Sequence, residues 1–226
     1  MITYFPPVEE AQPDGLLAIG GDLEVPSLKL AYESGIFPWP IENYPLLWFS
    51  PAQRAILEFN DLHIPRRLNQ ELRKKKFHFK IDQNFAEVIR HCAQGKMRQS
   101  SGTWITMQMI EAYLEFHQAG YAHSFECYNQ NNQLVGGMYG VGIGKMFAGE
   151  SMFFLESGAS KATLLYACDF LKQHHATWMD IQTLSPLLQQ FGAKEIPRTQ
   201  FLKKLKQAIS EMNIFSINKN YSLRSI

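Results

Sequence analysis

Apolar and polar residues follow two different rhythms along most of the chain, and these rhythms predict its strands and helices. Short runs with a period of two are typical of strands, and longer runs with apolar residues three and four apart are typical of helices. The pattern predicts strands at 55–59, 77–81, 122–128, 134–141, about 146–148 and 178–182. It predicts helices at 65–75, 82–95, 106–120, 160–174 and 199–212.

Local signals support several of these boundaries. Pro65 suits the first turn of a helix, and Asp82 and Ser160 are residue types that cap helix N-termini. The polar stretch 129–132 between two strands is a hairpin signal. Strands surrounded by helices, with an antiparallel core, predict an α+β layer fold.

The beginning of the chain is built differently from the rest. Residues 1–51 hold eight of the eleven prolines, and the only helix expected there runs from Ser27 as N-cap to Gly35 as its stop. Loops with exposed aromatic side chains are expected around it. These aromatic residues are Phe37, Trp39, Trp48 and Phe49. We therefore expect a small, irregular N-terminal domain at 1–52 and a larger domain at 53–226.

Composition narrows the class of protein. The chain has 226 residues, 46% hydrophobic and 19% charged, which is typical of a globular protein. Its three cysteines include no CxxC pair, which argues against a disulfide framework and a thiolate zinc site. The N-terminus has neither the basic start nor the apolar run of a signal peptide, and no stretch suits a membrane span. We expect a cytoplasmic protein that does not bind membranes.

Charge is balanced overall but unevenly distributed. The chain carries 22 basic and 21 acidic residues, yet between Arg66 and Lys80 seven basic residues stand against one acid, Glu71. On a helix these residues form a contiguous cationic surface. Such a surface is either simply solvated or a binding site for phosphates, and the density of charge favours the second interpretation.

Two strand ends carry polar side chains among apolar ones. Glu150 and Ser151 follow Gly149, which allows a ligand or backbone to approach closely, and flanking apolar residues would partly bury the carboxylate. Asp180 and Gln182 share one face of the expected strand 178–182, where an acid and an amide can orient an amine and help to remove its proton. The alternatives are a solvated or capping Glu150 and a solvated strand end.

Other motifs carry no specific chemistry. The glycines of 136–144 fit neither the P-loop nor the GxGxxG pattern, so a twisted strand with bulges is expected there. No spacing of histidines and acids indicates a metal site, and no Gly-x-Ser-x-Gly indicates a serine hydrolase. We expect neither a metal nor a cofactor.

Nine short blocks, in order along nearly the whole chain, strongly resemble the leucyl/phenylalanyl-tRNA–protein transferase family. They are GLLAIGGDL (15–23), YESGIFPW (32–39), WFSP (48–51), TWI (103–105), HS (123–124), LVGGMYG (134–140), GESMF (149–153), ASK (159–161) and DIQ (180–182). A single block is a weak signal, whereas nine in sequence are highly specific.

The resemblance implies a fold, an activity and a set of functional residues. The fold is a small N-terminal domain followed by an acetyltransferase-like (GNAT) domain with a mixed, mostly antiparallel sheet. The activity is transfer of Leu, Phe or Met from aminoacyl-tRNA to proteins that begin with Arg or Lys, which feeds the bacterial N-end rule degradation pathway. Asp180 and Gln182 match the catalytic pair, and Glu150 matches an active-site acid.

Further residues are expected to bind the substrates. Those expected at the aminoacyl, adenosine and acceptor groups are Glu150, Ser151, Trp39, Tyr32, Trp104, Met138, Phe147 and Met152. Those expected to bind tRNA are Arg66, Arg67, Arg73, Lys74 and Lys75. The sequence departs from the family pattern at Ile181, where cysteine is usual, at Leu187, where histidine is common, and at Gln70, one of the usual cationic positions.

Two other functions compete with this one. An acyl-CoA-dependent N-acetyltransferase would need a pyrophosphate-binding loop of the type Arg/Gln-x-x-Gly-x-Gly/Ala before a helix, and none is present. An RNA-binding or degradation-adaptor protein would use the basic helix and the aromatic residues alone. That alternative leaves the polar groups at the ends of apolar strands, Glu150, Asp180 and Gln182, without a role.

Overall fold

The computed structural model describes residues 1–41, 44–75, 77–94 and 104–216. In these residues seven strands form one large sheet in the order β10-β4-β9-β8-β7-β6-β5, and three form a small sheet in the order β1-β3-β2. The strands of the large sheet are β4 (Gln53–Glu58), β5 (His78–Ile81), β6 (Ala122–Tyr128), β7 (Leu134–Ile143), β8 (Met146–Phe154), β9 (Trp178–Gln182) and β10 (Lys194–Pro197). Those of the small sheet are β1 (Leu16–Ile19), β2 (Phe37–Pro38) and β3 (Leu47–Phe49).

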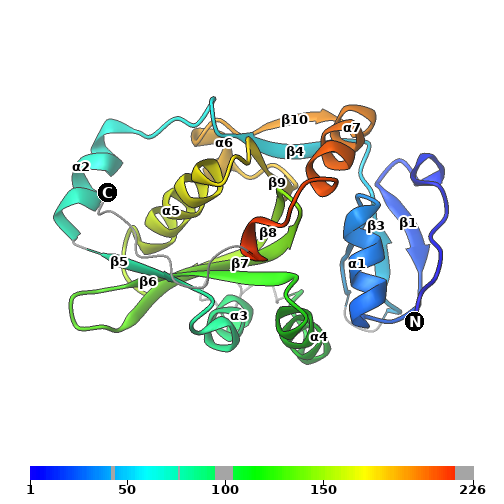
Figure 1. Cartoon of the computed structure of the whole chain (residues 1–226), viewed down its shortest axis with the longest axis horizontal. Helices are drawn as coiled ribbons and strands as arrows, with labels where there is room; N and C mark the ends of the chain where they lie inside the picture. Colours follow the sequence, from blue (N-terminus) through cyan, green and yellow to red (C-terminus); the bar gives the residue numbers. More distant parts are fainter. Residues whose placement is uncertain (42–43, 76, 95–103, 217–226) are drawn as a thin grey trace.

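Helices cover both faces of the large sheet (Figure 1). The described α-helices are α1 (Val25–Glu33), α2 (Arg66–Lys75), α3 (Phe85–Gln94), α4 (Met107–Gln118), α5 (Ala159–Gln173), α6 (Pro186–Gln190) and α7 (Arg198–Ile209). Helices α3 and α4 pack on one face, and α5 packs on the other. Neighbouring strands in the described part of this sheet are antiparallel except β8 and β9, which are parallel. The expected α+β fold class, with its mixed and mostly antiparallel sheet, is confirmed.

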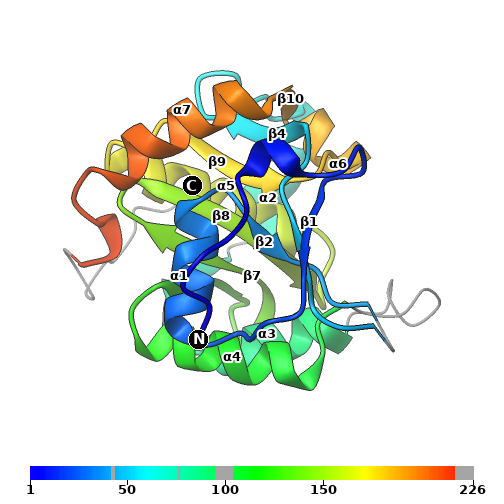
Figure 2. The ribbon, with the colours of Figure 1, turned by 90° about the vertical axis from the view of Figure 1, so that its right-hand side faces the viewer.

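The N-terminal segment is more ordered than its sequence suggests. Helix α1 lies between α4 and α7 (Figure 2), and its apolar residues belong to the same hydrophobic cluster as those of α3 and α4. The expectation of exposed aromatic side chains is wrong for Phe37 and Trp48, which are buried in β2 and β3. The division into domains at 1–52 and 53–226 stays a prediction.

Helix α1 forms where it was expected but starts earlier than Ser27. Its N-cap is Glu24, and Pro26 occupies the first turn, where its missing N–H costs nothing. The Ser27 hydroxyl is instead 2.6 Å from a carboxylate oxygen of Asp22, to which it donates. The hydroxyl also accepts a hydrogen bond from the backbone N–H of Ile2 at 2.7 Å, so contacts outside the helix use the group that a cap would use.

Asp82 and Ser160 are not caps either. Asp82 accepts hydrogen bonds from the His123 ring and from the backbone N–H of Ser124, while Glu126 accepts from the two N–H groups that precede α3. Ser160 is the second residue of α5, whose N-cap is Gly158 with φ +84°. Glycine is favoured there because a positive φ disfavours other residues.

Strand β8 is longer than the pattern predicts. It was expected at about 146–148 but continues through Gly149, Glu150 and Ser151, because β7 pairs with it over most of its length. The glycine-rich stretch is the expected bulged strand, with a register shift between Tyr139 and Gly140. No helix among the described residues is long and apolar enough to cross a lipid bilayer.

Candidate active site

The site forms where two parallel strands separate. Strands β8 and β9 are in register at Ala148 and Asp180, and the residues that follow on both strands line a cavity. The backbone of β9 turns sharply at its end, since Gln182 has φ +53° and the N–H of Thr183 donates to the carbonyl of Ile181 at 2.6 Å. A non-glycine residue in this region is strained, and such strain is concentrated at functional sites.

The cavity has a volume of about 270 Å³, and its lining is mostly apolar. Its apolar wall comes from β7, β8 and β9 and from α5 and α6. These residues are Met138, Gly149, Met152, Leu164, Met179, Ile181 and Leu188. Trp39 and Trp104 lie at the same cavity, and its polar wall contains Glu150, Ser151 and Gln182. The structure thus brings together seven of the residues expected from the sequence to bind or transform the substrates.

Asp180 is held by a buried arginine that the sequence analysis missed. Nε and Nη2 of Arg54, on β4, donate to the two carboxylate oxygens of Asp180 at 2.9 and 2.7 Å. Both side chains are only 2% exposed. A lone arginine in an otherwise apolar strand was the available signal, because a buried charge requires a partner.

Arg54 also joins the site to the surrounding elements. Its Nη1 donates to the carbonyl of Gly35 at 3.3 Å, and its guanidinium lies 4.6 Å from the ring centroids of both Phe37 and Phe201. These contacts connect β4 and β9 with the end of α1, β2 and α7. The ion pair is therefore fixed by the N-terminal segment as well as by the large sheet.

Asp180 and Glu150 hold Gln182 from two sides. The backbone N–H of Gln182 donates to Oδ1 of Asp180 at 3.0 Å, and its side-chain Nε2 donates to Oε1 of Glu150 at 2.8 Å. The amide oxygen of Gln182 accepts no hydrogen bond from the described residues. It is thus available to an incoming N–H group.

Glu150 has unusual electrostatics. Removal from water raises its pKa from the ordinary 4.5 to about 8, and the nearby charge of Asp180 adds to this effect. Hydrogen bonds from Tyr32 and Gln182 and the charge of Arg54 act in the opposite direction. Burial therefore dominates, and the carboxyl is mostly protonated at neutral pH in the free protein.

Tyr32 lies behind Glu150 rather than in the cavity wall. Its hydroxyl shares a short hydrogen bond with that of Tyr113 on α4, and both rings are buried. Burial raises the pKa of both phenols, and the charge of Glu150 raises them further. Phe147 is also absent from the cavity wall, because its fully buried ring packs against Phe125 and Phe215.

Two tryptophans from distant segments meet at the cavity. Trp39 follows β2, and Trp104 precedes α4. Their rings are stacked, with centroids 5.0 Å apart and an interplanar angle of 17°. Both side chains are half-buried. They form a flat aromatic surface of the kind on which a planar ring can stack.

The expected basic helix is present as α2. Arg66, Arg67 and Lys74 are exposed on it, and Arg73 and Lys75 belong to the same helix. The helix packs on the α5 side of the sheet through the buried Leu68 and Leu72. It does not line the cavity that contains Gln182.

A separate cluster could hold a cation by composition alone. The ligand atoms of Asp82, His117 and His123 lie within 4.8 Å of one another. Hydrogen bonds already occupy most of them: His123 Nδ1 lies 2.7 Å from Asp82, His123 Nε2 faces the Gly120 carbonyl, and His117 Nδ1 faces the Ala122 carbonyl. The hydrogen bonds of this cluster join β6 to the segment that precedes α3 and to the segment that follows α4.

Comparison with known proteins agrees with this arrangement. The family model "Leucyl/phenylalanyl-tRNA protein transferase" matches residues 56–206, and the model of that family's N-terminal domain matches residues 21–52. The chain belongs to this family. It is therefore an aminoacyltransferase.

Individual relatives extend over almost the whole chain. The leucyl/phenylalanyl-tRNA–protein transferase of Maridesulfovibrio salexigens is 45% identical over 91% of this chain and 85% of its own length. That of Flavobacterium johnsoniae is 45% identical over 90% of this chain and 95% of its own.

Similar solved structures are more distant. FemX is 10% identical, with a TM-score of 0.47 over 76% of this chain and 66% of its own. L-PGS from Bacillus licheniformis is 13% identical, with a TM-score of 0.43 over 72% of this chain and 51% of its own. Structural similarity at this level carries no further conclusion about this chain.

Replacing Arg54 tests the buried ion pair. Arg54→Met leaves Asp180 buried without a cationic partner, and we expect a loss of about 3–5 kcal/mol in the free energy of unfolding, measured in urea. The double variant Arg54→Met, Asp180→Leu removes both charges and should recover most of this loss. Arg90→Met, an exposed arginine on α3, is the control and should change stability by less than about 0.5 kcal/mol. A single variant as stable as this control would contradict the assignment.

Glu150 should make stability depend on pH. Its pKa is about 8 in the folded protein and near 4.5 when exposed, so the folded state holds a proton that the unfolded state loses between these values. Stability should therefore fall as pH rises from about 4.5 to 8. Glu150→Gln has no ionisable group at this position and should not lose stability in this way. The difference in Tm between Glu150→Gln and the wild type should therefore increase as pH rises across that range. An advantage that is constant with pH, or equal to that of Glu111→Gln on the exposed face of α4, would refute the raised pKa.

Proposed function

We propose that this aminoacyltransferase moves Leu, Phe or Met from aminoacyl-tRNA to the α-amine of proteins that begin with Arg or Lys. The observation that carries the proposal is the amide of Gln182, which is held by Asp180 and Glu150 beside an apolar cavity. An aminoacyl-tRNA ester is already activated. The enzyme must chiefly position an amine next to the ester carbonyl, and positioning alone contributes several kcal/mol.

Gln182 is the group best placed to orient the attacking amine. Its free amide oxygen would accept a hydrogen bond from the amine N–H, while the Nε2 group stays on Glu150. The nitrogen then forms a bond to the ester carbon, the bond to the 3′ oxygen breaks, and the amine proton leaves for that oxygen. The α-amine has an ordinary pKa near 7.7–8.0, so it needs only modest help to become a free base.

Asp180 would orient Gln182 rather than take the proton. Both of its oxygens accept hydrogen bonds from Arg54, and one also accepts from the Gln182 backbone. Protonation of this carboxylate would break a buried, bidentate ion pair. Its role is therefore to hold the strained end of β9 in place.

The apolar lining of the cavity would accept donor side chains that are unbranched at Cβ, such as Leu, Phe and Met, and exclude Val and Ile by shape. Met138, Met152 and Met179 contribute flexible thioethers that adapt to different shapes, which is consistent with use of Leu, Phe and Met. The terminal adenine would stack on the Trp39–Trp104 pair, since aromatic faces bind bases with little sequence demand.

Glu150 would receive the cationic side chain of the acceptor. In the free protein its pKa is about 8, and an approaching guanidinium or ammonium would lower this pKa and favour the charged carboxylate. Selection of Arg and Lys at the acceptor N-terminus follows from this pairing. The transfer would mark such proteins for degradation by the N-end rule, and its compartment would be the cytoplasm.

Transfer of radiolabelled leucine is the direct test. The wild type should label a protein that begins with Arg, only in the presence of Leu-tRNA, and Gln182→Ala should lower kcat/KM about 10²-fold because the amine is misplaced. Gln189→Ala removes an exposed amide on α6 and should leave the rate unchanged. Absence of labelling by folded wild-type protein that still binds tRNA would favour an RNA-binding adaptor instead.

The acceptor preference tests Glu150 separately. Peptides that begin with Arg and with citrulline have the same α-amine but differ in side-chain charge. The ratio of their kcat/KM values should favour Arg and should increase as pH rises through about 8, where Glu150 ionises. Glu150→Gln should bring this ratio close to one at every pH. A ratio that is unaffected by the substitution would show that another group selects the acceptor.

A further inference from the structure

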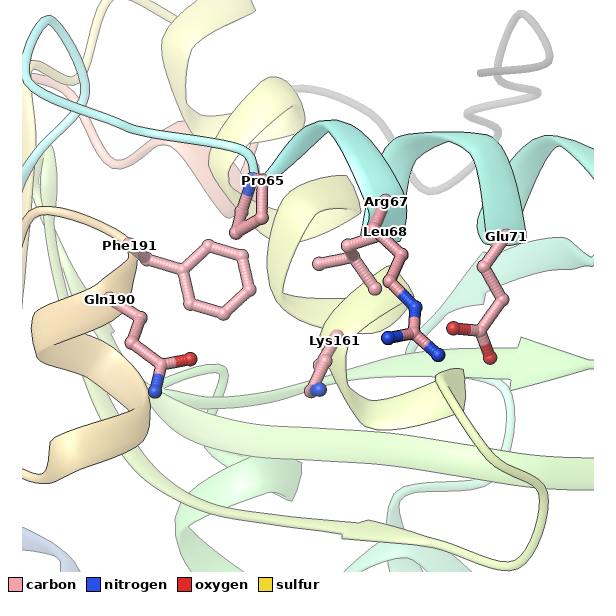
Figure 3. A pocket seen from close by; sticks show the side chains of 7 residues that line it. All are labelled: Pro65, Arg67, Leu68, Glu71, Lys161, Gln190 and Phe191. Carbon is pink, nitrogen blue, oxygen red and sulfur yellow. The ribbon is translucent and has the colours of Figure 1, made fainter.

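A second cavity lies between α2, α5 and α6 (Figure 3). Its volume is about 310 Å³, and none of the expected active-site residues lines it. Arg67 comes from α2, Lys161 from α5, and Gln190 from the end of α6. In Figure 3 the polar ends of these three side chains point to the same side of the cavity, with Lys161 between the other two. We name this space the Arg67–Lys161 cavity.

Neither of its two cations forms an ion pair with a described residue, although the carboxylate of Glu71 lies in the same wall on the Arg67 side (Figure 3). No carboxylate of the described residues lies within 4.0 Å of the charged nitrogens of Arg67 or Lys161. Lysines elsewhere on the described surface are commonly paired, as Lys29 is with Glu33 and Lys145 with Glu211. The cavity therefore concentrates positive charge that the folded chain itself does not neutralise.

The one carboxylate in the wall has other contacts. Oε1 of Glu71 accepts a hydrogen bond from the Ser157 hydroxyl at 3.4 Å, and it lies about 3.7 Å from the position that a Cβ on Gly158 would take. Glu71 is thus at the N-terminus of α5, where a negative charge complements the helix dipole. It leaves the cavity with an excess of one positive charge.

The positions of the two cations are unfavourable for the helices that carry them. Arg67 is the second residue of α2, and Lys161 is the third residue of α5, so both lie in a first turn that contains no acidic residue. The dipole at a helix N-terminus favours anions and disfavours cations. Local helix stability does not explain these residues, whereas an anion bound between them would offset both effects.

The Arg67–Lys161 cavity is next to the active-site cavity. Helix α5 contributes Lys161 to one and Leu164 to the other, three residues or about 5 Å apart along the helix axis. Helix α6 likewise contributes Gln190 to one and Leu188 to the other. On its far side the cavity is bounded by α2. It therefore lies on the path from the site of transfer to the exposed cations of α2.

We propose that the Arg67–Lys161 cavity binds a backbone phosphate of the single-stranded 3′ end of the donor tRNA. This inference rests on the proposed function, because the donor must reach the active site with its last nucleotide in the neighbouring cavity. Lys161 supplies a point charge, Arg67 supplies a planar fork that suits two phosphate oxygens, and Gln190 supplies an amide N–H. The phosphate fixes the strand just before it enters the active site.

Two stable ligands separate this site from the active site. In the first, leucine is joined by an amide bond to 3′-amino-3′-deoxyadenosine, which contains no phosphate. In the second, the same aminoacyl nucleoside ends a CpCpA trinucleotide. We expect Lys161→Gln to weaken binding of the trinucleotide about tenfold, measured by calorimetry, and to leave binding of the nucleoside unchanged. Arg67→Gln should act in the same way.

Lys172→Gln is the matched control. Lys172 is exposed in the last turn of the same helix, far from the cavity, and its loss should affect neither ligand. Lys161→Gln should also melt at or slightly above the wild-type temperature, since it removes a cation from a helix N-terminus. Equal weakening of both ligands by Lys161→Gln, or no weakening of either, would overturn the proposal.

Salt dependence with intact Leu-tRNA gives an independent readout. Loss of one contact to a single-stranded phosphate should reduce the slope of log Kd against log salt by about 0.7 in Lys161→Gln and not in Lys172→Gln. Lys161-dependent binding without leucine transfer by the wild type would contradict the proposed function alone. If the wild type transfers leucine but Lys161→Gln and Arg67→Gln bind the trinucleotide as tightly as the wild type, the phosphate site alone is contradicted.

Discussion

The buried pair of Arg54 and Asp180 is the constraint on which the rest of the site depends. Removing two charges from water is costly, and the structure offsets this cost by a bidentate contact, a carbonyl and two aromatic rings around the guanidinium. Those groups come from the end of α1, β2, β9 and α7. The N-terminal segment therefore helps to hold the ion pair at the strained end of β9, and its apolar residues belong to the same hydrophobic cluster as residues of the large sheet.

The ion pair positions the other polar residues of the site through a chain of hydrogen bonds. Asp180 fixes the backbone of Gln182, and Gln182 in turn contacts Glu150 across the gap between β8 and β9. The gap lies where the pairing of β8 and β9 ends: the two strands are in register at Ala148 and Asp180, and beyond this point β8 continues beside β7 and β9 beside β4. One part of the cavity lining is polar and contains Glu150 with its raised pKa, while the rest of the lining is apolar and includes flexible methionines. A single space can thus hold an amine and an apolar side chain at the same time.

The two cavities differ in the type of interaction that they offer. The active-site cavity is apolar with few polar groups, and it suits shape and orientation. The Arg67–Lys161 cavity presents unpaired cations and suits charge. Because α5 and α6 line both, a donor strand held in one would be aligned for the other by two rigid helices. Binding energy gained far from the reacting atoms would in this way contribute to their positioning.

The sequence by itself determined most of the elements and the identities of the polar residues at the cavity. Strands β6 and β9 coincide with the alternating runs, and the order of nine motifs indicated the family, because both signals are local in the chain. Tertiary contacts decided the rest. Ser27, Asp82 and Ser160 are residue types that cap helices, yet none of them is a cap here. Ile2 and His123, both distant in sequence, bind the side chains of Ser27 and Asp82, and the N-cap of α5 is Gly158. Arg54 is separated from Asp180 by 126 positions, and Lys161 from Arg67 by four strands and two helices, so no local pattern could show that each pair comes together. Only the folded chain brings such charges together, since burial and distance in space, not distance in sequence, determine their interaction.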